Sequence, residues 1–216
     1  MHRPELSRAP LSGASQGFFA VEYEPETGEV VMLDQRRLPT EVVYERHSKP
    51  DEVARAIREM RVRGAPAIGI SAAYALVQLA RSERGEASTF LVANGIAGRL
   101  LNDTRPTAVN LAWAVARMGR RAAEVASWAP EERERALQAE AEAIHREDVA
   151  ACRAMGALGA EAVPDGATIL THCNAGALAT GGYGTAIGVV GGAHAAAKMV
   201  RVLVSDALPH VKGARL

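Results

Sequence analysis

A strand–helix–strand unit near the C-terminal end restricts the possible folds more than any other feature of the chain. After the turn Pro164-Asp165-Gly166, the segment ATILTHC is short, apolar and β-branched. RVLVS follows within about 40 residues, behind a glycine-rich segment and a helical stretch to Lys198. Continuous apolar runs are typical of parallel strands buried on both faces. The sequence therefore predicts an α/β fold with a Rossmann-like parallel-sheet domain.

The N-terminal part of the chain has a different pattern. The first twenty residues show little periodicity and are expected to form a loose arm. Two β-rich runs between Phe18 and Leu38, separated by the turn at Glu26–Glu29, predict a β-hairpin. Helical spacing of apolar residues then predicts helices. They cover residues 52–62, 71–79, 90–101, 107–121 and 131–158. For the last of these, which is long and charged, a kink or break is left open.

These patterns divide the chain into two parts. We expect an N-terminal hairpin and helical domain over residues 1–150 and the start of the Rossmann-like domain over residues 151–216. The chain ends at Leu216, shortly after the second predicted strand. Because two parallel strands leave faces and edges uncovered, the second domain is expected to be truncated.

Charge and composition exclude several classes of partner. Lysine plus arginine equals aspartate plus glutamate, 25 each, so the formal net charge is zero. Proteins that bind nucleic acid normally carry surplus basic charge. This chain has no such surplus, so no nucleic-acid partner is expected. No apolar run approaches the roughly 18 residues that span a bilayer, and the N-terminus lacks a secretory apolar stretch. Cys152 and Cys173 are too few for a disulfide framework. We expect a cytoplasmic protein that does not bind membranes.

Two arginine-containing segments are candidates for binding an anion. In Arg61–Gly69, Arg63 leads into Gly64-Ala65-Pro66 and a helix, which sets a guanidinium beside backbone N–H groups. The alternative interpretation is a plain helix-to-helix turn with proline in the first turn. Arg105 precedes a proline at an expected helix start, where it could add a second bidentate contact. The alternative there is a solvated arginine near a helix cap.

The third candidate segment begins at Thr168 and contains Cys173. Open α/β sheets place ligands at the carboxyl ends of their parallel strands, and Cys173 lies at such an end. The loop that follows is rich in glycine, which would let backbone amides approach an anion and favour a thiolate. The alternatives are a buried small hydrophobe for the cysteine and tight helix–sheet packing for the glycines. The polar neighbours His172 and Asn174 favour a functional cysteine, whereas Cys152 is expected in the core.

Taken together, the candidate segments resemble the methylthioribose-1-phosphate isomerase family. The matching text is RGAPAIG from Arg63, RPTAVNL from Arg105, THCNAGALATGGYGTAIGV from Thr171, and GARL from Gly213. The resemblance runs from about Asp34 to the end of the chain, and the order and spacing of four motifs make it specific.

This resemblance implies an enzyme that isomerises 5-methylthioribose 1-phosphate to 5-methylthioribulose 1-phosphate in methionine salvage. It implies a homodimer and neither cofactor nor metal. Cys173 is implied as catalytic, and Arg63, Gly64, Ala65 and Arg105 as substrate-binding. The family's catalytic aspartate lies in a later segment that this chain lacks, so the chain as given is expected to be inactive on its own.

The segment before GARL departs from the family pattern. Ala207 and Leu208 stand where threonine and arginine are expected, and Lys212 stands where a glutamine contacts the substrate. We expect Lys212 to remain a substrate-binding position with altered chemistry, since lysine only donates hydrogen bonds. Two alternatives follow: isomerisation of 5-deoxyribose 1-phosphate or ribose 1,5-bisphosphate, or a non-catalytic sugar-phosphate sensor like the regulatory subunits of the eukaryotic translation-initiation exchange factor.

Overall fold

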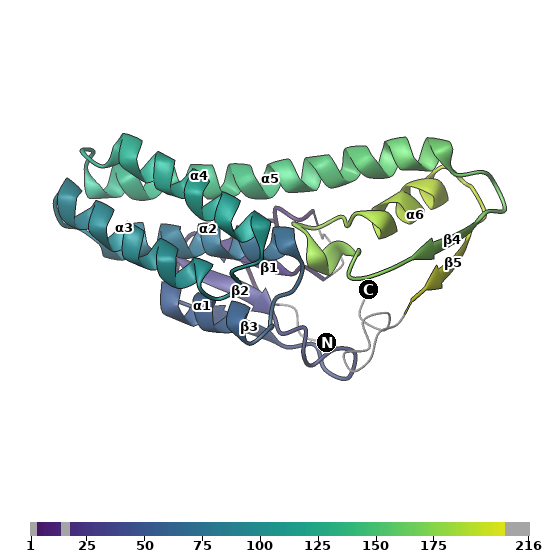
Figure 1. Cartoon of the computed structure of the whole chain (residues 1–216), viewed down its shortest axis with the longest axis horizontal. Helices are drawn as coiled ribbons and strands as arrows, with labels where there is room; N and C mark the ends of the chain where they lie inside the picture. Colours follow the sequence, from purple (N-terminus) through teal and green to yellow (C-terminus); the bar gives the residue numbers. More distant parts are fainter. Residues whose placement is uncertain (1–3, 14–17, 206–216) are drawn as a thin grey trace.

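The computed structural model describes residues 4–13 and 18–205. Figure 1 shows a helical part that covers a small antiparallel sheet, a second part with two parallel strands, and one long helix that extends along both. The elements, in chain order, are β1 (Val21–Glu24), β2 (Glu29–Leu33), β3 (Tyr44–His47), α1 (Pro50–Arg58), α2 (Ala65–Ser82), α3 (Ala87–Asn102), α4 (Val109–Val125), α5 (Pro130–Ala162), β4 (Thr168–Thr171), η1 (Ala177–Ala179), α6 (Ala186–Ala195) and β5 (Arg201–Val204). The predicted α/β fold class is confirmed.

The predicted hairpin forms the first two strands of an antiparallel sheet with the order β1-β2-β3. Gly28 adopts a positive φ of 76° at the turn between β1 and β2, a conformation that glycine adopts without strain. The third strand was not predicted, because the sequence YERH is polar and lacks an apolar run. It pairs antiparallel with β2, which sets Val31 opposite Arg46 and Met32 opposite Glu45.

The expectation of a loose N-terminal arm is wrong for residues 4–13. The backbone N–H groups of Leu11 and Ser12 donate to the carboxylate of Glu22, at 3.1 and 2.9 Å. Arg8 pairs with Glu142 of α5 at 2.5 Å. These acceptors lie outside residues 4–13, so no local pattern within this segment could predict the hydrogen bonds.

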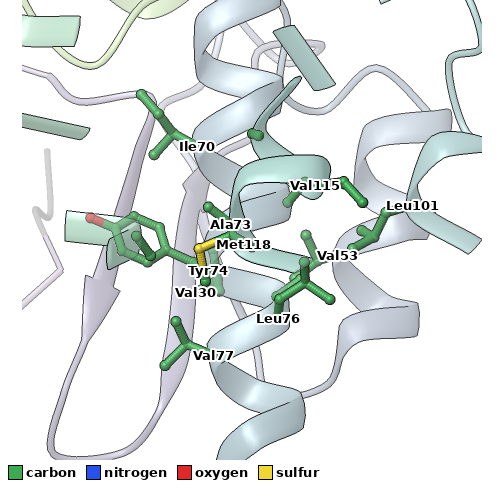
Figure 2. Close-up of a cluster of buried hydrophobic side chains, with 14 of the residues drawn as sticks. Val30, Val53, Ile70, Ala73, Tyr74, Leu76, Val77, Leu101, Val115 and Met118 are labelled. Atoms are coloured by element: carbon green, nitrogen blue, oxygen red, sulfur yellow. The ribbon is translucent and has the colours of Figure 1, made fainter. Parts of the chain in front are cut away.

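Helix α2 forms the centre of the hydrophobic core. It is apolar on all sides and packs against α1, α3, α4 and α5, while the sheet covers its remaining face. Figure 2 shows Ile70, Tyr74 and Leu76 of this helix meeting side chains from the strands and from the other helices. Each is fully buried or nearly so. Burial of a side chain of this size stabilises the fold by roughly 1.5–3 kcal/mol.

Helix α5 is one helix from Pro130 to Ala162, with no break between its ends. It passes through residue 150, so the expected division between two domains falls inside a helix. The division itself stays a prediction. The C-terminal half of α5 packs closely on α6, where a Cβ on Gly192 would lie 2.5 Å from the carbonyl oxygen of Gly156. Glycine is therefore required where these two helices touch.

The predicted strand–helix–strand unit is confirmed, with β4 and β5 parallel and α6 between them in the chain. The expectation that both strands are buried is wrong for the described structure. Leu170 of β4 is 71% exposed and Leu203 of β5 is 50% exposed. An apolar run predicts a strand, but whether its faces are covered depends on which elements pack on them. None of the helices in the described ranges is both long enough and apolar enough to cross a membrane.

Candidate functional site

Three turns from distant parts of the chain surround one cavity of about 380 Å³. The three are the α1–α2 turn, the α3–α4 turn and the loop after β4. The segment that follows β2 also borders the cavity. The lining residues are Gln35, Met60, Arg63, Gly64, Ala65, Ile68, Arg105, Thr107, Ala108, Cys173 and Asn174. The predicted residues Arg63, Gly64, Ala65, Arg105 and Cys173 are therefore brought together in space. Lys212 lies outside the described residues.

The α1–α2 turn supplies Arg63 and the start of helix α2. Gly64 is the residue before the first helical turn and has a φ of 91°, and its carbonyl accepts the N–H of Ile68 at 3.0 Å. A Cβ at this position would lie 2.3 Å from the carbonyl oxygen of Ala179. The glycine therefore lets η1 approach the start of α2. It leaves the first N–H groups of α2 beside Arg63 at the wall of the cavity.

Arg105 lies in a turn between α3 and α4. The N–H of Arg105 donates to the carbonyl of Asn102 at 3.3 Å, and the N–H of Ala108 donates to the carbonyl of Arg105 at 2.9 Å. These bonds close a turn, so α4 starts at Val109 rather than at Thr107, and Pro106 precedes the helix instead of opening it. The turn holds the half-buried Arg105 at the wall of the cavity.

Cys173 follows β4 by two residues and has a φ of 68°. A left-handed backbone is uncommon for a residue other than glycine, and such positions cluster at functional sites. The thiol is exposed and borders the cavity, as does the side chain of Asn174. His172 is directed elsewhere, because its Nδ1 lies 2.5 Å from the Oγ of Ser205 beside β5.

The glycine-rich loop after Cys173 uses its backbone amides internally. The N–H groups of Gly182 and Gly184 both donate to the hydroxyl of Thr180, at 3.2 and 3.0 Å. A Cβ on Gly182 would lie 2.5 Å from the carbonyl oxygen of Ser12. For these glycines the structure favours the packing interpretation over direct contact between their amides and an anion.

A buried network attaches this loop to the helical part. Asp148 of α5 accepts the N–H of Gly181 at 2.6 Å, and the Nε2 of His145 lies 2.7 Å from the Gly181 carbonyl. The carbonyl can only accept, so Nε2 carries a proton, and the Nδ1 of a neutral imidazole would accept from the hydroxyl of Tyr74, which lies 2.8 Å away. Burial raises the pKa of Asp148, although the Gly181 N–H acts in the opposite direction. The N–H and the carbonyl of Gly181 are therefore both bonded to side chains of α5, which fixes the loop on this helix.

Sequence reasoning missed Gln35 and Met60 as members of the site. Gln35 follows the apolar strand β2 and is only 3% exposed. The available signal was a polar residue just after a strand. Because β2 is antiparallel, the rule that ligands bind at the carboxyl ends of parallel strands does not apply to it. Met60 has a φ of 59°, which no sequence pattern indicated.

The other cysteine lies apart from the cavity. Cys152 is 3% exposed within α5, as expected for a core position, and burial raises the pKa of its thiol. In residues 4–13 and 18–205, no three side chains among histidine, cysteine, aspartate and glutamate converge as a metal site would require. The polar groups that the cavity offers are guanidinium groups, amides, a hydroxyl and a thiol.

The fold and the cavity together define a class of protein. It is an α/β protein with a helical part joined to a parallel-sheet part, and its candidate site lies at the carboxyl end of the first parallel strand, where the two parts meet. Within that class, the chain belongs to the Initiation factor 2 subunit family, whose sequence profile matches residues 61–216.

Curated relatives and solved structures support this assignment. The chain is 51% identical over 189 residues to a methylthioribose-1-phosphate isomerase from Desulforudis audaxviator, a match that covers 88% of this chain and 54% of the relative. A relative of the same name from Geobacter metallireducens is 46% identical over 200 residues, with coverage of 92% and 57%. The chain spans about half the length of the curated relatives it matches.

Two crystal structures share the fold. One, described as 5-methylthioribose 1-phosphate isomerase from Pyrococcus horikoshii, superposes with a TM-score of 0.86 at 39% identity and covers 99% of this chain and 59% of its own. The other, described as translation initiation factor eIF-2B subunit delta from A. fulgidus, has a TM-score of 0.81 at 35% identity, with coverage of 93% and 58%.

Proposed function

We propose that this chain carries the phosphate-binding and thiol side of an aldose–ketose isomerase that converts 5-methylthioribose 1-phosphate to 5-methylthioribulose 1-phosphate. The observation that carries the proposal is the convergence of Arg63, Arg105 and Cys173 on one cavity. The names of the relatives described above support the choice of substrate. The same names support a place in methionine salvage.

The arginine side of the cavity suits the phosphate group. Arg63 and Arg105 carry permanent positive charge and present planar forks that can bind phosphate oxygens in pairs. The N-terminal end of α2, which begins at Ala65, adds backbone N–H groups and the positive end of a helix dipole. These groups lie on rigid turns, so they would hold the phosphate in place throughout the reaction.

The thiol side of the cavity suits proton transfer at the sugar carbons. The phosphate blocks the anomeric oxygen of this substrate, so the reaction must move hydrogen between C1 and C2 while the phosphate stays attached. Cys173 lines the same cavity as the arginines. We propose that its thiol exchanges a proton with the reacting sugar.

The test is to incubate the full-length protein with 5-methylthioribose 1-phosphate and to measure the ketose product. Product formation that is lost in Cys173→Ser and retained in Cys152→Ser would support the proposal. No ketose from a folded wild-type protein that binds the substrate would reject it.

A second candidate function is a sugar-phosphate sensor without catalysis. The solved structure described as an eIF-2B delta subunit favours it, because that protein shares the fold at 35% identity. The two functions differ in one measurement: a sensor binds the sugar phosphate with an affinity that calorimetry detects, yet it releases the compound unchanged.

The choice among related substrates is proposed to depend on Lys212. If this residue tunes specificity, Lys212→Gln should change the ratio of kcat/KM for 5-methylthioribose 1-phosphate to that for ribose 1,5-bisphosphate. Equal ratios in both proteins would reject the idea. The homodimer and the cytoplasmic location also stay predictions, and light scattering of the full-length protein would test the first.

A further inference from the structure

Gln35 is a buried polar residue at the wall of the cavity that no motif includes. It lies two residues after β2 and is 3% exposed. Its backbone N–H donates to the carbonyl of Arg61 at 2.9 Å. The preceding residue, Asp34, is 1% exposed and holds Arg36 through two side-chain hydrogen bonds at 2.9 and 2.8 Å. The backbone that carries Gln35 is therefore fixed on both sides.

The side-chain amide of Gln35 is also fixed in orientation. Its Nε2 donates to the carbonyl oxygen of Leu178 at 2.8 Å. Since that carbonyl can only accept, the amide nitrogen must face Leu178 and the amide oxygen must face away from it. Across residues 4–13 and 18–205, no donor bonds to the Gln35 Oε1, and this atom is not among the fully enclosed polar atoms. The oxygen is thus available to the cavity that Gln35 lines.

The charged groups that line the cavity only donate hydrogen bonds. The Gln35 oxygen is an acceptor, so it indicates which part of a ligand lies beside it. The guanidinium groups of Arg63 and Arg105 have no acceptor atom, and the start of α2 likewise offers N–H groups. An amide oxygen repels a phosphate oxygen and accepts from a hydroxyl. A ligand with a phosphate at the arginines would therefore turn a hydroxyl-bearing part toward Gln35.

We propose that Gln35 is a specificity-determining residue that accepts a hydrogen bond from a ring hydroxyl of the bound sugar phosphate. The proposal rests on the sugar-phosphate site described above and deepens it. It assigns the phosphate to one side of the cavity and a hydroxyl to the Gln35 side. Both polar atoms of the amide then have a hydrogen-bond partner, which is Leu178 for the nitrogen and the ligand for the oxygen.

The test compares ligands that differ by one hydroxyl. Affinities of the full-length wild-type protein and of Gln35→Met are measured by calorimetry for inorganic phosphate, ribose 1-phosphate, 2-deoxyribose 1-phosphate and 3-deoxyribose 1-phosphate. Wild type should bind at least one deoxy ligand more weakly than ribose 1-phosphate, by roughly 5- to 100-fold, the range for one unpaired polar group. Gln35→Met should lose that preference and keep its affinity for inorganic phosphate.

A matched control separates recognition from structural support. Gln78 is also 3% exposed, and its Nε2 donates to the carbonyls of Gly28 and His47, away from the cavity. Gln78→Met should lower the melting temperature without changing the ratio of the ligand affinities. If Gln35→Met keeps the wild-type ratio as well, Gln35 is only structural and the proposal is overturned.

Two further outcomes keep the proposal distinct from the isomerase assignment. Hydroxyl discrimination that depends on Gln35, in a protein that forms no ketose, would reject the isomerase and retain the role of Gln35. If Gln35→Met does not fold, a crystal structure of wild type with ribose 1-phosphate decides. A ring hydroxyl within about 3.0 Å of Oε1 supports the proposal, and the absence of any hydroxyl at that distance overturns it.

Discussion

Gly64→Ala should damage both the stability of the protein and its phosphate site. Gly64 has a φ of 91° and a ψ of 132°, a backbone conformation that alanine adopts only under strain. The added Cβ would lie 2.3, 2.4 and 2.5 Å from the carbonyl oxygen, Cα and Cβ of Ala179. Two of these atoms belong to the backbone, so the contact cannot be relieved by a side-chain rotation.

The expected loss of stability in Gly64→Ala is the sum of two separate costs. Holding a residue other than glycine in this region costs about 1–3 kcal/mol. Forcing an additional carbon into a packed contact costs typically about 1–3 kcal/mol more. Their lower limits together give about 2 kcal/mol. In a domain of this size each kcal/mol lowers Tm by about 2–4 °C, so Tm should fall by at least about 4 °C.

Thermal unfolding and calorimetric titration with inorganic phosphate test this reasoning together. We expect the clash to be relieved by movement of η1 away from the start of α2, where Gly64 and Ala65 line the cavity, so phosphate affinity should fall along with Tm. Gly119→Ala in α4 is the matched control, because no atom lies within 4 Å of its added Cβ, and alanine should stabilise the helix by roughly 0.8–1 kcal/mol. A Gly64→Ala protein with wild-type Tm, or with lower Tm and unchanged phosphate affinity, would refute the proposed contact.

Four more substitutions, one of them a control, probe the site and its support. Cys173→Ser should lower kcat roughly 100-fold or more while KM changes little, whereas Cys152→Ser should leave steady-state kinetics unaltered. Arg105→Lys should weaken phosphate binding by about 1–3 kcal/mol despite the retained charge, because the guanidinium fork is lost; an unchanged KM would count against it. Burial raises the pKa of Asp148, so the folded state binds more protons than the unfolded state, and stability falls as pH rises from the ordinary carboxyl pKa through the raised one. Asp148→Asn can still accept the Gly181 N–H and should flatten that part of the pH–stability curve; an identical slope in both proteins would contradict this origin.

Local chain chemistry was enough to predict most of the secondary structure. The turn at Gly28, the apolar periodicity of the helices and the β-branched runs at β4 and β5 each depend on neighbours within a few residues. Family motifs also predicted that Arg63, Arg105 and Cys173 belong to one site. The lengths of the helices were less accessible, since α2 starts six residues earlier than the expected residue 71.

Features that depend on distant partners could not be predicted from the sequence. Strand β3 forms because β2 offers it an edge, and residues 4–13 are held by carboxylates of β1 and α5. The glycine loop was expected to offer amides to an anion, but Thr180 uses them instead. For strand β3 and residues 4–13, the deciding hydrogen bonds join groups whose proximity is created by the fold, whereas Thr180 and the glycines that it binds are only two and four residues apart.

The sequence by itself determined which groups are candidates for the site: two arginines on turns, a cysteine just after a strand and the glycines beside them. Tertiary structure decided which other groups share their cavity and which atom each presents. Gln35 shows the difference, because its neighbours in the chain form an ordinary strand end, whereas Leu178 fixes its amide and Arg61 fixes its backbone. The orientation of a side chain depends on contacts that exist only after distant segments have packed together.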